Sequence, residues 1–113
     1  MDGFLDVAAL LVSLTLEEKA ALCLGSDFWH TAPVDRLGIP ATMLADGPHG
    51  LRKEIDDAAQ GSLGESVPAT CFPTASALGS SWDVELMQEV GVALGVESSA
   101  EGVAVLLGPG VNI

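Results

Sequence analysis

Apolar residues in the first part of the chain follow helical spacing and are preceded by helix-capping residues. Thr15 and Glu18 have the Thr-x-x-Glu spacing of a capping box, and a segment of helix-forming residues then runs up to Gly25. A capping box before such a segment and a glycine after it predict a helix between these positions. The apolar stretch 4–14 is expected to form an earlier short helix packed on the same core, and residues 27–37 are expected to be irregular.

A longer helix is predicted in the second half of the chain. Its apolar residues recur at intervals that place them on one helical face: Val84, Met87, Val90, Ala93, Leu94 and Val96. One of the serines at positions 80 and 81 is expected to cap this helix, with Asp83 in its first turn and Gly102 after its end. Gly91 and Gly95 weaken this helix relative to alanine. We therefore expect these small residues to allow another backbone to approach the helix closely.

Two short apolar runs, residues 41–45 and 103–107, have the length and the flanking turn residues of buried strands. The longer helix lies between them in sequence, so the order is strand, helix, strand. Continuous apolar strands in this order predict a parallel pair whose two faces are both covered. Residues 53–80 form a connection long enough to be functional or mobile, and its acidic part is expected to be a solvated loop.

The predicted elements are too few for a complete domain of this type. A (β/α)₈ barrel takes about 250 residues, whereas this chain has 113 residues and supplies two strands. We therefore expect an α/β fold in which residues 1–113 form part of one incomplete domain. The expected architecture is the N-terminal portion of a (β/α)₈ TIM-like barrel, truncated after its second strand.

Composition and charge restrict the partners. The chain carries 4 Lys and Arg against 16 Asp and Glu, a net charge of −12, which argues against binding to nucleic acid or to anionic membranes. Hydrophobic residues make up 49% and charged residues 18% of the chain, against about 25% charged in ordinary domains. This excess of apolar residues predicts that part of the surface packs against the remainder of a longer enzyme or against a second copy in a homo-oligomer.

Targeting and metal signals are weak in this sequence. The apolar run 7–12 is far shorter than the roughly 20 residues of a membrane span, and no Lys or Arg precedes Lys19 as a signal peptide would require. The sequence therefore favours a cytoplasmic location over secretion. Cys23 and Cys71 stand 48 residues apart, which fits neither a disulfide framework nor a zinc site; we expect two buried or half-buried thiols, no metal and no cofactor.

The residues best suited to chemistry follow the predicted strands. Asp46 comes directly after the first strand, and the Gly-Pro-Gly turn 108–110 follows the second. Ligands of parallel α/β folds bind at the carboxyl ends of strands, so both loops are expected to face one pocket. Turn residues after Asp46 can bring Arg52 back toward the carboxylate, and such a pair suits a polyhydroxylated ligand. Spacing alone favours the plainer alternative of a surface turn closed by a salt bridge.

Residues 46–52, which read Asp-Gly-Pro-His-Gly-Leu-Arg, resemble the Asp-Gly-Pro-x-Gly-x-Arg signature of glycoside hydrolase family 3. Four other segments are similar to the same family in the same order: the first helix from residue 14 to 19, the lead-in 36–40, the segment 72–83 and the second-strand segment 102–113. The resemblance covers residues 14–113, almost the whole chain.

The resemblance implies a retaining, β-glucosidase-like hydrolase whose barrel can be of an incomplete type found in this family. It implies that Asp46 holds hydroxyl groups of the sugar in the −1 subsite of a β-glucoside or oligosaccharide, and that Arg52 lines the same subsite and contributes to binding of the substrate. The family's Asp nucleophile and Glu acid/base lie downstream of the matching segments. No catalytic residue is therefore assigned within these 113 residues, and the chain is expected to be inactive alone.

Other residues are weaker candidates. His49 lies at a variable position of the signature and is expected to be a loop residue. The aromatic segment 28–30 could form a sugar-stacking edge or belong to the core, and Trp82 is expected to be a packing residue. Two other functions remain open at this point: a non-catalytic fragment that binds sugar, and a small flavodoxin-like binding domain that would be stable as a monomer.

Overall fold

The computed structural model describes residues 6–55 and 65–110 of the chain. The chain divides into two compact units, Met1–Thr42 and Met43–Ile113, and each is described by itself. Within the described residues, no helix combines the length and the apolar character that crossing a membrane requires.

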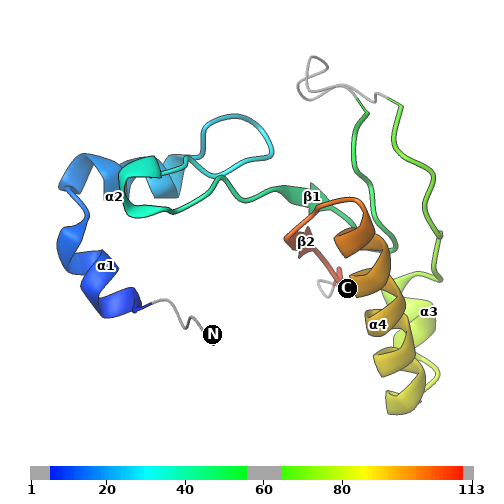
Figure 1. Cartoon of the computed structure of the whole chain (residues 1–113). Helices are drawn as coiled ribbons and strands as arrows, with labels where there is room; N and C mark the ends of the chain where they lie inside the picture. The colour runs from blue at the N-terminus through cyan, green and yellow to red at the C-terminus, as the bar shows by residue number, and fades with distance from the viewer. Residues whose placement is uncertain (1–5, 56–64, 111–113) are drawn as a thin grey trace. The chain divides into compact units, whose positions relative to one another are not determined.

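The first unit contains α1 (Val7–Ser13), α2 (Leu16–Leu24) and the short 3₁₀ helix η1 (Asp35–Leu37), coloured blue to cyan in Figure 1. The predicted helix over 4–14 is confirmed in its described part, where the carboxylate of Asp6 caps α1; residues 4 and 5 lie outside the described residues. In the described part of this stretch Leu14, directly after the helix, is buried, whereas α1 itself has no buried residue and contributes nothing to a core.

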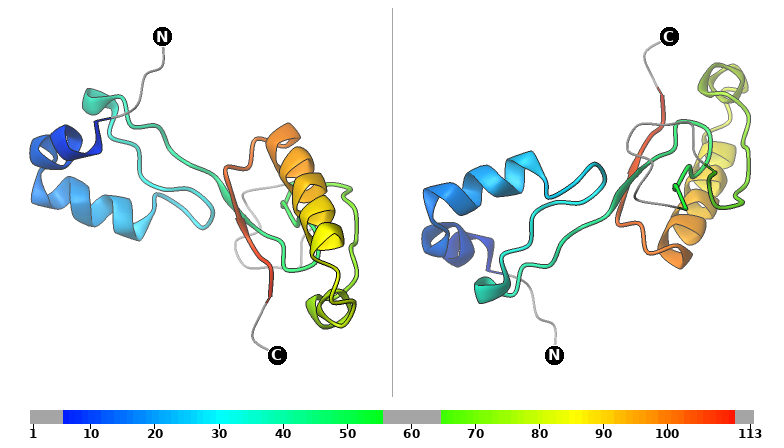
Figure 2. Two further views of the ribbon diagram at one scale, coloured as in Figure 1. Left: turned by 90° about the horizontal axis from the view of Figure 1, so that it is seen from below. Right: turned by 90° about the horizontal axis from the view of Figure 1, so that it is seen from above.

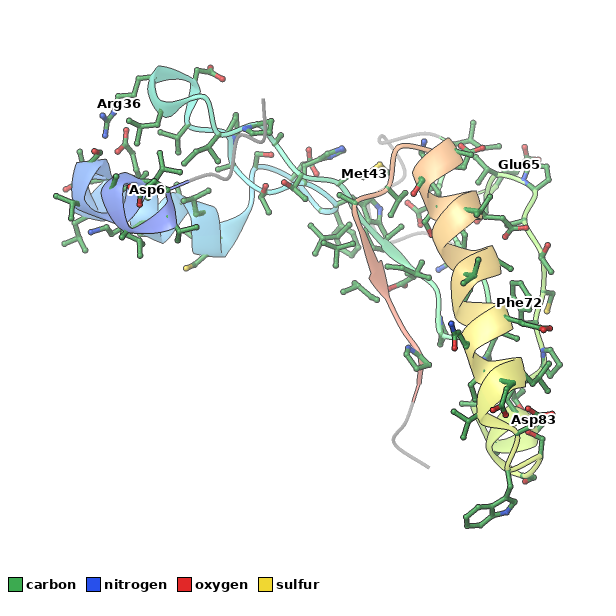
Figure 3. All side chains as sticks on the ribbon, turned by 60° about the horizontal axis from the view of Figure 1, so that its bottom comes forward. Asp6, Arg36, Met43, Glu65, Phe72 and Asp83 are labelled. Carbon is green, nitrogen blue, oxygen red and sulfur yellow. The ribbon has the colours of Figure 1, made fainter. Side chains whose placement is uncertain are left out.

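The predicted capping box of α2 is confirmed. The Thr15 amide donates to Oε2 of Glu18 over 2.8 Å, and the Glu18 amide donates to Oγ1 of Thr15 over 3.2 Å. The helix ends at Gly25, whose φ of +83° suits glycine. The side chain of Arg36 turns toward α1 and α2 (Figure 3), where it donates to both carboxylate oxygens of Glu18 and, over 2.8 Å, to the carbonyl of Ser13.

The second unit is a small α/β arrangement with two parallel strands. Strands β1 (Leu44–Asp46) and β2 (Val105–Leu107) pair in parallel, with Leu44 opposite Val105 and Asp46 opposite Leu107. Helices α3 (Ala75–Gly79) and α4 (Val84–Ala100) connect them, and α4 lies alongside the strand pair in both views of Figure 2. The predicted order of strand, helix and strand is confirmed.

Both strands are shorter than the sequence predicts, because competing hydrogen bonds satisfy the residues before them. The amide and carbonyl of Thr42 bond to Thr31 instead of to a strand. The amide of Val103 donates to Ser98 and that of Gly102 to Ser99, with Gly102 at φ +71°. These bonds form a Schellman motif that ends α4, so the second strand begins only at residue 105.

The N-terminus of α4 also differs from the prediction. Its cap is Asp83, whose Oδ1 accepts the amide of Leu86 over 2.9 Å, and not a serine; Asp83 marks the start of α4 in Figure 3. Ser80 and Ser81 donate instead to carbonyls of the unpredicted helix α3. Trp82 has a φ of +53°, which separates the two helices.

The core of the second unit is small. Ala45, Leu51 and Val103 are buried in the described residues, with Met43, Val67 and Leu106 packed around them. The predicted apolar face of α4 is half-buried at its central positions, whereas Val84 and Val96 are exposed. Trp82 is 92% exposed, so its expected packing role is wrong within the described chain.

Candidate functional site

Asp46 and Arg52 lie side by side at the end of β1. Asp46 is the last residue of the strand, and the amide of Arg52 donates to its carbonyl over 2.8 Å in an antiparallel bridge. Nη1 of Arg52 lies 3.9 Å from Oδ2 of Asp46, and both side chains are partly exposed. The geometry thus brings together the two residues that the sequence singled out, with polar atoms accessible from outside.

A third charged residue lies close to the guanidinium of Arg52. Nη2 of Arg52 lies 3.9 Å from Oε1 of Glu54, whose side chain is only 6% exposed. Arg52 is therefore shared between a buried carboxylate and the accessible carboxylate of Asp46. The sequence places Glu54 at the start of an acidic stretch expected to be a solvated loop, and this expectation is wrong for Glu54, whose side chain is buried beside Arg52. The signal that could have found its role is its position two residues after Arg52, on the same side of an extended segment.

Glycines allow the backbones around Asp46 to approach closely. A Cβ at Gly47 would lie 2.3 Å from the side chain of Leu106, and one at Gly108 would lie 2.4 Å from the carbonyl oxygen of Gly47. Real Cβ atoms do not tolerate such distances. The loops that follow β1 and β2 are therefore in direct contact, as the parallel arrangement predicts.

Gly50 fixes the return of the loop toward Arg52. Its φ is +149°, and a Cβ there would lie 2.2 Å from the carbonyl oxygen of Thr70. The neighbouring His49 carbonyl accepts the amide of Phe72 over 2.8 Å. The segment around residues 70–72 therefore forms one wall of the 46–52 loop.

Hydrogen bonds to α4 and to its C-terminal cap fix the position of Thr70 in this wall and of Lys53, the residue after Arg52. The amide and hydroxyl of Thr70 donate to the carboxylate of Glu97, and Nζ of Lys53 donates to the Glu101 carbonyl over 2.7 Å. The Val67 amide donates to the Lys53 carbonyl over 2.9 Å. The position of Arg52 is thus determined by bonds that reach the last turn of α4.

A shallow pocket of about 230 Å³ lies on this wall, lined by Pro48–Arg52 and Ala69–Cys71. Asp46 is not among its lining residues. Nδ1 of His49 is buried without a hydrogen-bond partner in the part of the chain that the structure describes. The arrangement can bind a polyhydroxylated ligand, because Asp46 accepts hydrogen bonds from hydroxyl groups and Arg52 donates them. The described residues hold no group of three or more His, Cys, Asp or Glu side chains able to bind a metal ion.

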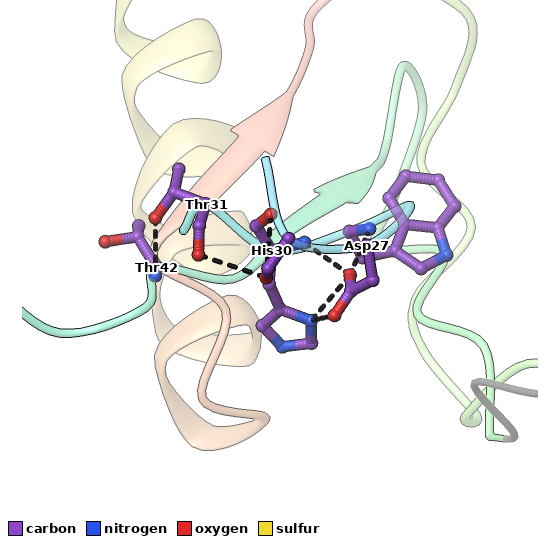
Figure 4. Close-up of polar contacts among 6 residues, drawn as sticks. Asp27, His30, Thr31 and Thr42 are labelled. Atoms are coloured by element: carbon purple, nitrogen blue, oxygen red, sulfur yellow. Dashed lines mark hydrogen bonds and ion pairs between the residues drawn. The ribbon is translucent and has the colours of Figure 1, made fainter. Parts of the chain in front are cut away.

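The aromatic segment of the first unit forms a loop organised by Asp27 (Figure 4). Its Oδ1 accepts the amides of Trp29 and His30, each over 2.8 Å, and lies 3.0 Å from Nδ1 of His30. The bond from the Trp29 amide, with those from His30, lowers the pKa of Asp27 below its ordinary value. The rings of Phe28 and Trp29 meet edge to face with centroids 4.9 Å apart. The aromatic residues stand out in the sequence, whereas Asp27, whose carboxylate bonds to the backbone of this loop, does not.

Both cysteines are free and exposed, so the expectation of buried or half-buried thiols is wrong for the described chain. Cys71 reaches the surface because it lies on the wall of the shallow pocket, and Cys23 because α2 has no buried residue.

Comparison with known proteins gives consistent results. No protein-family model matches the chain. It is 59% identical over 108 residues to thermostable beta-glucosidase B of Acetivibrio thermocellus. The matching region covers 96% of this chain and 14% of that protein. It is 56% identical over 101 residues to an exo-alpha-(1->6)-L-arabinopyranosidase of Bifidobacterium longum, covering 88% of this chain and 13% of that protein.

Two solved structures match the fold as well as the sequence. The GH3 beta-glucosidase of Bifidobacterium adolescentis is 53% identical with a TM-score of 0.75, over 91% of this chain and 14% of that chain. The beta-glucosidase of Kluyveromyces marxianus in complex with glucose is 40% identical with a TM-score of 0.80, over 92% of this chain and 12% of that chain. The chain thus spans only about an eighth of the length of the proteins that it matches.

Proposed function

From its relationship to glycoside hydrolase family 3 over nearly its whole length, we propose that this chain is the sugar-binding N-terminal portion of a retaining glycosidase barrel. Asp46 and Arg52 bind the non-reducing sugar of a β-glucoside in the −1 subsite. The observation that carries the proposal is the return of Arg52 to Asp46 at the carboxyl end of β1, with a 3.9 Å approach of their charged groups. Ligands of barrel folds bind at this end of the strands.

The proposed role is binding and not bond cleavage. In retaining glycosidases a nucleophilic carboxylate and an acid/base carboxyl lie about 5–5.5 Å apart across the scissile bond. We assign both to the remainder of the enzyme. The hydrogen bonds that sugar hydroxyls donate to Asp46, and those that they accept from Arg52, supply binding energy that helps to distort the ring toward the transition state.

The identity of the sugar has two candidates, because relatives named for β-glucoside and for α-L-arabinopyranoside cleavage are similarly close, at 59% and 56% identity. Both sugars are pyranosides whose ring hydroxyls can bond to Asp46 and Arg52. We favour the β-glucoside, since the solved relative with 53% identity is a beta-glucosidase.

The experiment replaces the 108 matching residues of the Acetivibrio thermocellus enzyme by this chain; this protein is called the chimera below. We expect the chimera to hydrolyse an aryl β-glucoside with kcat/KM within about tenfold of the parent and to prefer it over an aryl α-L-arabinopyranoside. The parent enzyme without the segment is the control and should be inactive. A chimera that melts cooperatively and yet cleaves neither substrate would contradict the proposal.

A further inference from the structure

An apolar groove of about 330 Å³ runs between α4 and β2. Gly91, Gly95 and Ser98 line it from α4, and Leu106 and Pro109 line it from β2 and the residues after it. None of its lining residues is charged. The groove therefore suits an apolar segment and not an ionic partner.

Small residues keep the helix side of the groove open. Gly91, Gly95 and Ser98 are spaced by four and three positions and so share one face of α4. A Cβ built at Gly91 or Gly95 would meet no atom within 4 Å. Helix interiors do not favour glycine, and close packing of a further segment against this face would account for the two glycines.

Ser98 gives an independent indication. It is 6% exposed, and its hydroxyl has no hydrogen-bond partner among the described residues. Buried hydroxyl groups in native proteins are almost always paired. Since Ser98 lines the groove, a rotation about its χ1 bond can direct the hydroxyl toward a segment lying there.

The topology indicates what that segment is. The β1–α4–β2 connection places α4 over one face of the strand pair. If the sheet continues beyond β2 through another right-handed crossover, the next helix lies on the same face beside α4, on its β2 side. The groove lies at this position.

We propose that the groove binds a helix of the remaining polypeptide, which packs closely over Gly91 and Gly95 and hydrogen-bonds the hydroxyl of Ser98. The proposal rests on the proposed function, in which this chain is one part of a larger barrel. The relatives leave ample polypeptide for such a helix, because this chain covers only 12–14% of them.

Thermal unfolding of the chimera tests the proposal without using activity. Gly91→Leu and Gly95→Leu should each lower Tm by about 5 °C or more, or prevent folding, because the leucine would occupy the space of the packed helix. On an uncovered helix face the same changes would raise Tm, since leucine favours helix over glycine. Val92→Leu, at an exposed position of α4, is the matched control and should leave Tm within about 2 °C.

Ser98→Ala keeps the test decisive if the leucine variants do not fold. Loss of a hydrogen bond in a covered groove should lower Tm by about 2–4 °C, whereas removal of an unpaired hydroxyl would raise it. A raised Tm in Gly91→Leu or in Ser98→Ala would overturn the proposal. Light scattering gives a further test. If the parent chimera is a dimer and the Gly91→Leu variant is a monomer, the groove binds a second copy, which would also overturn the proposal.

Discussion

Asp46 and Arg52 approach each other because Gly47 and Pro48 allow a turn directly after the strand and because Gly50 can adopt a φ of +149°. The spacing of the motif was sufficient to predict that the arginine returns toward the carboxylate. It was insufficient to predict Glu54, since the burial of that carboxylate depends on packing that the motif does not encode. At the scale of single residues, the sequence therefore identified the two accessible residues of the site, Asp46 and Arg52, and missed the buried carboxylate of Glu54 beside Arg52.

Gly50→Ala should disrupt the loop in the chimera. The substitution combines an unfavourable φ with a Cβ 2.2 Å from the Thr70 carbonyl oxygen, and we expect a loss of about 2–4 kcal/mol in the free energy of unfolding together with a raised KM. Gly79→Ala is the matched control, because a Cβ there meets nothing within 4 Å. Denaturant unfolding measures the free energy of unfolding of both variants. If Gly50→Ala is as stable as Gly79→Ala, the loop relaxes to accommodate the added methyl group and the prediction is wrong.

Arg52 and Asp46 should act as one unit in substrate binding. Arg52→Ala should lower kcat/KM less than Asp46→Ala, because the carboxylate keeps its own bonds to the sugar. The double variant should lose less than the sum of the two single losses, with a coupling of about 0.5–3 kcal/mol in a double-mutant cycle. Strict additivity would mean that the 3.9 Å approach of the two side chains has no role in binding.

At the scale of elements, two capping signals were predicted correctly, whereas the serine cap expected for α4 and the ends of the strands were not. The capping box of α2 and the glycine after α4 were both predicted correctly. The strand ends were not, because Thr42 and Val103 bond to residues outside the strands. Helix α3 was missed since a five-residue helix is too short to create a periodic pattern, and its only signal was the capping Thr74.

The contact between α2 and η1 should depend on pH through Glu18. Hydrogen bonds from Arg36 and then from the Thr15 amide lower its pKa from 4.5 to about 2. A lowered pKa in the folded state means that the stabilisation is complete above pH 4.5 and is lost as the pH falls toward 2. Glu18→Gln should therefore lower Tm of the chimera at pH 6, and the difference from the parent should shrink at pH 3.

Glu17→Gln is the control for this titration, because Glu17 lies in the same first turn of α2 without a bond to Arg36. Its effect on Tm should be small at both pH values. A Tm difference for Glu18→Gln that stays constant between pH 6 and pH 3 would argue against the ion pair as its source.

At the scale of the whole molecule, the described residues bury few side chains. Leu14 and Val34 are the buried apolar residues described in the first unit, and Ala45, Leu51 and Val103 those described in the second. Large apolar residues such as Val92 and Val96 stay exposed. The composition had predicted this need for further contacts, and the groove beside α4 is one place where we propose that they are made.

The isolated 113-residue chain should therefore be inactive and unable to form a stable monomer. Two strands with unpaired edges and exposed apolar faces favour self-association. Light scattering and thermal unfolding of the purified chain measure this, with an aryl β-glucoside assay on the same sample. A monomer with a sharp melt would favour an independent binding domain, and steady hydrolysis would show that the reacting carboxylates lie within these residues.

The most direct test of the account is Michaelis kinetics of the Asp46→Ala chimera on an aryl β-glucoside. Two hydroxyl hydrogen bonds to a carboxylate contribute about 1.5–3 kcal/mol each, so their loss should lower kcat/KM by about 10²–10⁴, with kcat falling as well as KM rising. Asp35→Ala, at an exposed position of η1, controls for loss of an acidic residue and should stay within about twofold of the parent. An Asp46→Ala chimera that folds, as circular dichroism would verify, and keeps kcat/KM within threefold would contradict the account and leave Asp46 as a residue of a turn.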